Sequence, residues 1–184
     1  MEQKYLSDDI FEQIKAIEQI KDFNRKKLTE EQELLIDKLI LNEELKERYK
    51  ENGLCKECKQ PNTGNYPDSS EWCQSCNGKR FQQDFENWTS GNSDVDKLIQ
   101  ESQLNAKNCD EKLEWIEYDR FENIEYVAKG GFGTIYKAIW KDGFIEDWNY
   151  ETNQWGRWGN KTFALKGLNN SKDITLEFLN EVIF

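Results

Sequence analysis

The chain has 184 residues, of which 36% are hydrophobic and 33% are charged, and its formal net charge is −11. No window approaches the ~18 uncharged apolar residues of a membrane-spanning helix, so the composition excludes a transmembrane segment and we expect no membrane partner. Seven Trp and seven Tyr favour packed cores over disorder. The acidic excess argues against a nucleic-acid partner, because phosphate binding needs clustered Lys and Arg. The sequence contains no His, which excludes an imidazole base or ligand.

The N-terminal segment MEQKYLSDDI lacks the basic start and apolar run of a secretory signal. Five cysteines, an odd number, without such a signal indicate a reducing compartment in which thiols bind metal or stay unpaired. We therefore expect a cytoplasmic or otherwise intracellular protein. Shifts in charge and aromatic content predict an α+β chain of four unlike segments. These segments are residues 1–52, 53–82, 83–114 and 115–184.

Residues 1–52 are predicted to form a helical hairpin. Ser7 suits the N-cap of a first helix, with Asp8 and Asp9 in its first turn. Thr29 and Gln32 match a capping box that opens a second helix. The first helix has its apolar stripe at Ile10, Ile14, Ile17 and Ile20, and the second, which is expected to end at Gly53, has Leu35, Leu39, Leu45 and Tyr49 along its body. The two stripes are expected to pack on each other, and the alternative is a face that docks a partner.

Residues 53–82 contain two Cys-x-x-Cys pairs separated by fourteen residues. Each pair can direct two thiolates at one ion, and two pairs complete the tetrahedral shell that Zn²⁺ accepts. The segment is too polar to fold alone, so we expect structural Zn²⁺ to supply its folding energy, with no open position for catalysis. A redox pair, an iron–sulfur cluster and a nucleic-acid-binding knuckle are weaker alternatives. The predicted metal ligands are Cys55, Cys58, Cys73 and Cys76, and Cys109 is expected to be a spare thiol.

Residues 83–114 are predicted to be a helical spacer. Phe81, Phe85 and Trp88 recur at helical spacing, and Ser93 suits the start of a further helix. The acidic stretch 110–119 is expected to be an exposed connection, with Leu113 and Trp115 as the residues that could anchor it to the following segment. Neither stretch indicates a site.

A glycine-rich turn follows at 129–133, between two segments rich in β-branched and aromatic residues. Such a turn can bring backbone N–H groups close to a polyphosphate, although a hairpin without function fits the same residues. Lys166 ends the strand-like run Phe163–Lys166, which suits an amine directed at phosphates. Glu181 lies fifteen residues later in a helix-like stretch and could be the carboxylate that a buried Lys needs.

On these motifs, residues 115–184 resemble the start of a eukaryotic protein-kinase domain of the tyrosine-kinase-like and Ser/Thr groups. The resemblance implies the antiparallel sheet of the small lobe and the start of its αC helix. It implies that Ile135 and Ala164 sandwich the adenine of ATP and that Lys166 pairs with Glu181. The implied ATP-binding residues are Ala128, Lys129, Gly130, Gly131, Phe132, Gly133, Ile135, Ala164 and Lys166. The helical and four-cysteine leader is similar to leaders of fungal kinase-like proteins.

The chain departs from the kinase pattern in four ways. Ala128 stands where the loop normally begins with glycine, and residues 141–160 lengthen the gap before Lys166, which we interpret as an inserted β-hairpin. No His-Arg-Asp loop or magnesium-binding Asp-Phe-Gly is present. The chain also stops at Phe184 within an apolar run, which predicts a truncated domain.

The resemblance implies that a full-length relative transfers phosphate from Mg-ATP to a Ser, Thr or Tyr hydroxyl of a protein substrate. The chain as given is predicted to be catalytically inactive and to bind ATP weakly. The alternative function is that of a non-catalytic adaptor, stapled by zinc, with a kinase-like remnant.

Overall fold

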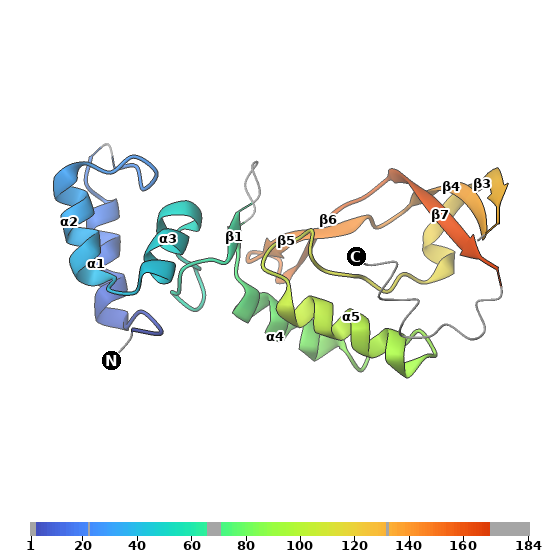
Figure 1. Cartoon of the computed structure of the whole chain (residues 1–184), viewed down its shortest axis with the longest axis horizontal. Coiled ribbons are helices and arrows are strands. Elements are labelled where there is room, and N and C mark those ends of the chain that lie inside the picture. Colours follow the sequence, from blue (N-terminus) through green and yellow to red (C-terminus); the bar gives the residue numbers. More distant parts are fainter. Residues whose placement is uncertain (1–2, 22, 66–70, 132, 170–184) are drawn as a thin grey trace. The chain divides into compact units, whose positions relative to one another are not determined.

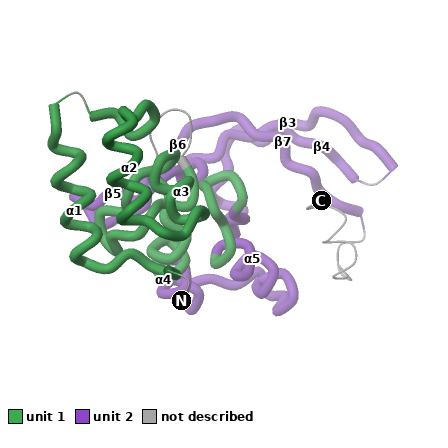
Figure 2. Tube along the Cα trace, turned by 60° about the vertical axis from the view of Figure 1, so that its left-hand side comes forward, with its two compact units in different colours: residues 1–80, 104–111 green, residues 81–103, 112–184 purple. Residues whose placement is uncertain are grey.

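The computed structural model describes residues 3–21, 23–65, 71–131 and 133–169. Helices and antiparallel strands form a mixed α+β chain, as the sequence predicts (Figure 1). The chain divides into two compact units (Figure 2): unit 1 comprises residues 1–80 and 104–111, and unit 2 comprises residues 81–103 and 112–184. No helix among the described residues combines the length and the apolar character needed to cross a membrane.

Three helices begin unit 1, and the N-caps of the first two are the predicted residues. The Ser7 side chain accepts the backbone N–H of Ile10, and Thr29 and Gln32 form the complete capping box. Acidic residues occupy the first turn of each helix, where the positive end of the helix dipole stabilises them. The helices are α1 (Asp8–Glu18), α2 (Glu30–Leu39) and α3 (Glu43–Asn52).

The prediction of a single long helix between Thr29 and Gly53 is wrong, because two helices, α2 and α3, occupy this segment. The backbone leaves the helix at Ile40, where φ is −109° and ψ is 95°, and α3 starts again after Asn42, whose side chain caps it. The Gln3 side chain stabilises this break, because its amide accepts from Leu41 N and donates to Leu39 O. These contacts satisfy backbone groups that the helix break leaves without helical partners.

The break also changes which side chains form the core of unit 1. Ile36 is fully buried, whereas the predicted core residue Leu35 is 43% exposed. Ile20 lies beyond the end of α1 and is 48% exposed, so the predicted first stripe ends at Ile17. The buried cluster consists of Leu6, Ile14, Ile17, Ile36, Ile40, Leu45, Tyr49 and Leu54.

The cysteine segment packs directly against these helices. The Gln60 side chain donates to the Leu6 carbonyl at 2.9 Å and accepts the Leu6 N–H at 2.7 Å. Asn52 at the end of α3 and Asn62 each donate a side-chain N–H to the other's carbonyl, at 3.4 and 3.1 Å. Reciprocal hydrogen bonds of buried groups fix a single register between the leader and the cysteine segment.

A short hairpin and a later segment of the chain complete unit 1. Trp72 is 1% exposed, and its indole N–H donates to the carbonyl of Ala106 at 2.8 Å. Residue 64 must be glycine, because a Cβ there would lie 2.4 Å from the carbonyl oxygen of Lys107. The strands are β1 (Gly64–Asn65) and β2 (Glu71–Trp72), and α4 (Gln74–Asp84) follows and extends across the boundary between the units.

Unit 2 contains two separate antiparallel sheets. The first has three strands in the order β3-β4-β7, and the second is the hairpin β5-β6 (Figure 1). The predicted hairpin within residues 141–160 is therefore confirmed, with Gly143 at φ +70° before β5. The elements are α5 (Ser93–Asn105), η1 (Tyr118–Arg120), β3 (Phe121–Gly130), β4 (Gly133–Trp140), β5 (Phe144–Asn149), β6 (Gln154–Trp158) and β7 (Lys161–Leu168).

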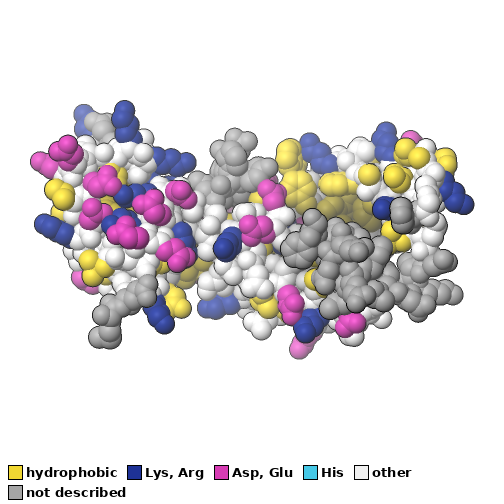
Figure 3. Space-filling view, viewed as in Figure 1, with side chains coloured by type: hydrophobic (Ala, Val, Ile, Leu, Met, Phe, Trp, Pro, Cys, Tyr) yellow, Lys and Arg dark blue, Asp and Glu magenta, His cyan; other side chains and the backbone are white. Residues whose placement is uncertain are grey.

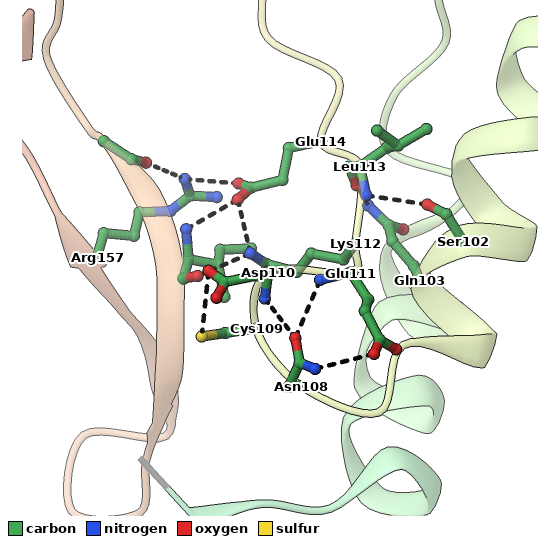
Figure 4. A network of polar contacts seen from close by, with 12 residues as sticks. Ser102, Gln103, Asn108, Cys109, Asp110, Glu111, Lys112, Leu113, Glu114 and Arg157 are labelled. Carbon is green, nitrogen blue, oxygen red and sulfur yellow. Dashed lines mark hydrogen bonds and ion pairs between the residues drawn. The ribbon is translucent and has the colours of Figure 1, made fainter. Parts of the chain in front are cut away.

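The acidic connection that the sequence predicts to be exposed is instead partly buried. The side chains of Lys112 and Glu114 are 2% and 9% exposed and form an ion pair at 3.2 Å. Glu114 also accepts from Arg157 of β6 at 3.0 Å and from the Ile145 N–H of β5 at 2.8 Å (Figure 4). This network attaches the connection to the inserted hairpin.

Aromatic side chains also hold the hairpin in place within unit 2. Trp155 of β6 stacks on Phe81, with ring centroids 4.5 Å apart and planes at 17°, and Trp148 of β5 meets Trp155 edge-on at 5.1 Å. Figure 3 shows hydrophobic side chains gathered over the strands of this unit, whereas charged side chains of both signs cover the helices of unit 1. The inserted hairpin is thus a packed part of the unit.

Candidate functional site

The four predicted metal ligands lie together in unit 1. The sulfur atoms of Cys55, Cys58, Cys73 and Cys76 are all within 4.8 Å of one another, so this group could hold a metal ion. The Cys55–Cys76 and Cys58–Cys73 sulfur pairs are 3.8 and 3.6 Å apart. A tetrahedral zinc site with Zn–S bonds of about 2.3 Å has sulfur–sulfur edges of about 3.8 Å. The sulfur arrangement therefore fits tetrahedral zinc coordination.

Two tight turns direct these thiols inward. In the first, Lys59 adopts the left-handed conformation at φ +62°, its N–H donates to the Cys55 carbonyl, and Cys55 N–H donates to Gln60 O. In the second, Cys73 immediately precedes α4 and its carbonyl accepts the N–H of Asn77, which places Cys76 in the first helical turn. Each pair is thus presented by local backbone hydrogen bonds.

The pKa values of the thiols indicate that a bound cation would stabilise the cysteine group. The pKa of Cys55 is lowered, most strongly by hydrogen bonds with the Cys58 and Cys73 thiols and less by the backbone N–H groups of Cys58 and Glu57. Burial, followed by the nearby charge of Cys55, raises the pKa of Cys76 to about 12. Hydrogen bonding with Cys55 and burial raise the pKa of Cys73. One thiolate therefore opposes the ionisation of its neighbours, whereas a divalent metal stabilises all four thiolates together.

Basic side chains of the cysteine segment form ion pairs with carboxylates. Lys59 lies 3.3 Å from Asp8 at the start of α1, and Arg80 contacts Glu57 between the first two cysteines. Cys109, the fifth cysteine, is buried outside the group, and its thiol lies 3.9 Å from the Asp110 carboxylate. Among the described residues the candidate metal ligands are therefore the predicted four.

The glycine-rich turn and Lys166 are brought together by the three-stranded sheet of unit 2. The turn joins β3 to β4, and Gly130 pairs with Gly133 at its base. Ile135 of β4 pairs with Ala128 of β3 on one side and with Lys166 of β7 on the other. Directly paired residues share a face of a sheet, so these three lie in one row beside the turn.

Ala164 joins the same face, because it lies two residues from Lys166 on β7. Ala164 and Lys166 are exposed, and Ile135 is 38% exposed. The opposite face contains buried Ala138 and Trp140. Four of the predicted nucleotide contacts thus share the open face of the sheet, and Ala128 fits its strand without a positive φ.

The glycines of the turn differ in what the protein requires of them. A Cβ at residue 133 would lie 2.4 Å from the Gly167 carbonyl oxygen, so close strand packing demands glycine there. Among the described residues, a Cβ at residue 131 would meet nothing within 4 Å, and a Cβ at residue 130 would meet only the Gly133 oxygen at 4.0 Å. Packing within the described part of the chain therefore does not explain these two glycines, which lie at the turn between β3 and β4.

Not every predicted contact belongs to this face. Lys129 pairs with Thr134 and is one residue out of phase with Ala128, so it belongs to the opposite face. Phe132 and Glu181 lie outside the described residues, as does the predicted helix after residue 170. The proposed Lys166–Glu181 pair therefore stays a prediction.

Sequence reasoning missed the Lys112–Glu114–Arg157 network, because no sequence motif links Glu114 to Arg157, more than forty positions away.

Comparison with known proteins identifies no relative: no family model, no curated protein and no solved structure matches this chain. The two candidate sites are thus supported by their residues and geometry alone.

Proposed function

We propose that residues 115–184 are the ATP-binding part of a protein-kinase small lobe and that the four cysteines hold a structural zinc ion. The observation that carries the kinase proposal is the row Ala128–Ile135–Lys166 beside the glycine-rich turn. This row combines an apolar surface for a base with one amine for phosphates. A protein of this kind transfers a phosphoryl group to a Ser, Thr or Tyr hydroxyl of a protein substrate.

The residues on this face fit the nucleotide in three respects. Ile135 and Ala164 offer small apolar surface on one side for adenine. Lys166 lies on the strand beside the turn, where its ammonium can bind phosphate oxygens. Gly130 and Gly131 leave backbone N–H groups uncovered by any Cβ. ATP would supply the transferable phosphoryl group, and these residues would bind and orient it.

The chain as given contains no residues that match the kinase catalytic loop or its magnesium ligands. We therefore expect no phosphoryl transfer by this chain, which the proposal assigns to a longer relative. The second candidate is a non-catalytic adaptor stapled by zinc. Two observations favour this function. The cysteine group brings four ligands together for a structural metal, whereas Lys166 is exposed on an open face of the sheet.

The kinase proposal is tested with an acyl-phosphate derivative of ATP, which acylates an amine close to bound phosphates and traps weak binding. Mass spectrometry of the labelled chain should identify Lys166 as the modified residue, and excess ATP should suppress the label. Lys161 is the internal comparison, because it is an exposed lysine on the same strand but on the other face.

Equal labelling of Lys161 and Lys166, unaffected by ATP, would overturn the proposal. Selective labelling of Lys166 would argue against a mere adaptor. A Gly131→Ala variant should lose the ATP-protected label, because its new methyl group would block the approach of the phosphates to the backbone. It should keep its stability, since among the described residues this methyl group meets no protein atom within 4 Å.

A further inference from the structure

Unit 1 contains a pocket of about 410 Å³, distinct from the cysteine group and from the proposed nucleotide face. This volume is within the range of small-molecule sites. The loop between α1 and α2 forms one wall, and the end of α1 and the start of the cysteine segment form others. The lining residues on which the argument depends are Phe23, Arg25, Lys26, Leu54, Lys56 and Lys15.

The charges around the pocket do not cancel. Four basic side chains and the two carboxylates of Glu18 and Glu71 line it. Glu18 is bound to Lys15 at 2.7 Å, and Glu71 to Lys56 at 3.4 Å. Arg25 and Lys26 therefore give the described lining a net positive charge, in a chain whose formal net charge is −11. A basic cavity in an acidic protein favours an anionic ligand.

The Arg25 guanidinium packs against Gly53, and its Nε donor makes no hydrogen bond to a described residue. Gly53, with φ +70° at the end of α3, makes room for the guanidinium, since a Cβ there would lie 2.9 Å from Nη1 of Arg25. The Nε of Arg25 is buried and has no hydrogen-bond partner among the described residues. A buried charged donor without a partner is unfavourable, so the Arg25 guanidinium, whose side chain lines the pocket, would be stabilised by an anionic ligand there.

Two apolar side chains also line the pocket. Leu54 is 7% exposed within the core of unit 1, and Phe23 packs against the same core. A ligand that occupies the whole pocket would therefore combine an oxyanion with an apolar or aromatic body.

We propose that this pocket binds a small organic anion, a phosphate monoester or carboxylate attached to an aromatic or apolar group. Arg25 and Lys26 bind the oxyanion, and Phe23 and Leu54 contact the body. The inference is independent of the kinase proposal, because it involves only unit 1.

Phenyl phosphate and benzoate are the probes, with inorganic phosphate as the head group alone and benzyl alcohol as the neutral ring. Each is titrated at constant ionic strength into the zinc-loaded full chain and followed by ¹H–¹⁵N NMR. Phenyl phosphate or benzoate should shift the signals of 23–26 and 54–56, inorganic phosphate should bind more weakly to the same residues, and benzyl alcohol should leave them unchanged. The stronger of the two ring anions identifies the head group.

The double variant Arg25→Gln/Lys26→Gln should weaken binding about tenfold or more, because it removes the charge-assisted hydrogen bonds. Lys27→Gln is the matched control, since Lys27 belongs to the same basic turn but does not line the pocket. The single Lys26→Gln change at an exposed residue keeps the test valid if loss of Arg25 impairs folding. Equal binding by the double variant and the control, or shifts spread over all surface lysines, would overturn the proposal. Binding of benzyl alcohol as strong as that of phenyl phosphate would also overturn it.

Discussion

The cysteine group of unit 1 and the glycine-lysine face of unit 2 differ in how much of each site the chain encloses. Cys55, Cys73 and Cys76 are 1 to 5% exposed, and the group has four ligand atoms for a four-coordinate ion. Lys166 is exposed, and Ile135 keeps 38% of its surface open. An enclosed site can contribute its binding energy to folding, whereas an open face contributes only when something covers it.

The largest effect should come from the metal group. Cys73→Ser/Cys76→Ser is expected to abolish metal binding and unfold unit 1, because structural zinc contributes about 10 kcal/mol or more of binding free energy to small modules of this type. Elemental analysis should find about one zinc per chain in the wild type and none in the variant. Cys109→Ser is the control and should keep the metal, since that sulfur lies outside the group. Unchanged metal content in the double variant would refute the site.

The next effect concerns the buried network that attaches the inserted hairpin. Glu114→Ala should destabilise unit 2 by about 3 kcal/mol or more, because it removes a buried carboxylate that binds Lys112, Arg157 and the Ile145 N–H. Urea unfolding followed by Trp fluorescence measures the change. Glu117→Ala is the matched control, since its residue is exposed and its carboxylate accepts, among the described residues, the Trp115 indole N–H alone, at 2.9 Å. Equal stabilities of the two variants would show that the network contributes nothing.

A smaller effect separates the glycines of the turn. Gly133→Ala should destabilise unit 2 by about 1–3 kcal/mol, because its Cβ would overlap the Gly167 carbonyl and push β4 from β7. Gly131→Ala should leave the free energy of unfolding nearly unchanged. Thermal unfolding of the two variants checks this difference. If both destabilise alike, then both glycines serve the fold, and the argument for open backbone beside Lys166 fails.

The smallest effect is expected at the exposed Arg120–Asp142 pair. Hydrogen bonds from Arg120 lower the pKa of Asp142 below its usual value. The folded state is therefore stabilised at pH values above the unfolded pKa, and this contribution disappears as the pH falls through the folded pKa. Asp142→Asn should slightly lower stability at pH values above the unfolded pKa, and this difference from the wild type should disappear as the pH falls through the folded pKa, so the acid limb of the stability curve becomes slightly flatter. An Arg120→Gln variant should show the same change, and an unaltered acid limb in both would exclude the pair as its cause.

The sequence correctly predicted the elements that depend on interactions between residues close together in the chain. Thr29 and Gln32 form the expected capping box, the cysteine pairs form their turns, and residues 141–160 contain the expected hairpin. The helix break at Ile40 was missed because the stabilising amide belongs to Gln3, thirty-eight residues from Leu41. A helical pattern cannot reveal a competitor for backbone hydrogen bonds that lies elsewhere in the chain.

The sequence by itself determined the α+β class, the four candidate metal ligands and the inserted hairpin, because these depend on residue type and short spacing. Only the tertiary structure decided that Glu114 is buried against Arg157, that Gly53 accommodates Arg25, and that Ala128, Ile135 and Lys166 share one row. Each of these facts depends on strand register or on packing between distant segments. Such contacts are fixed by burial and hydrogen bonding across the fold, which leave no periodic signal along the chain.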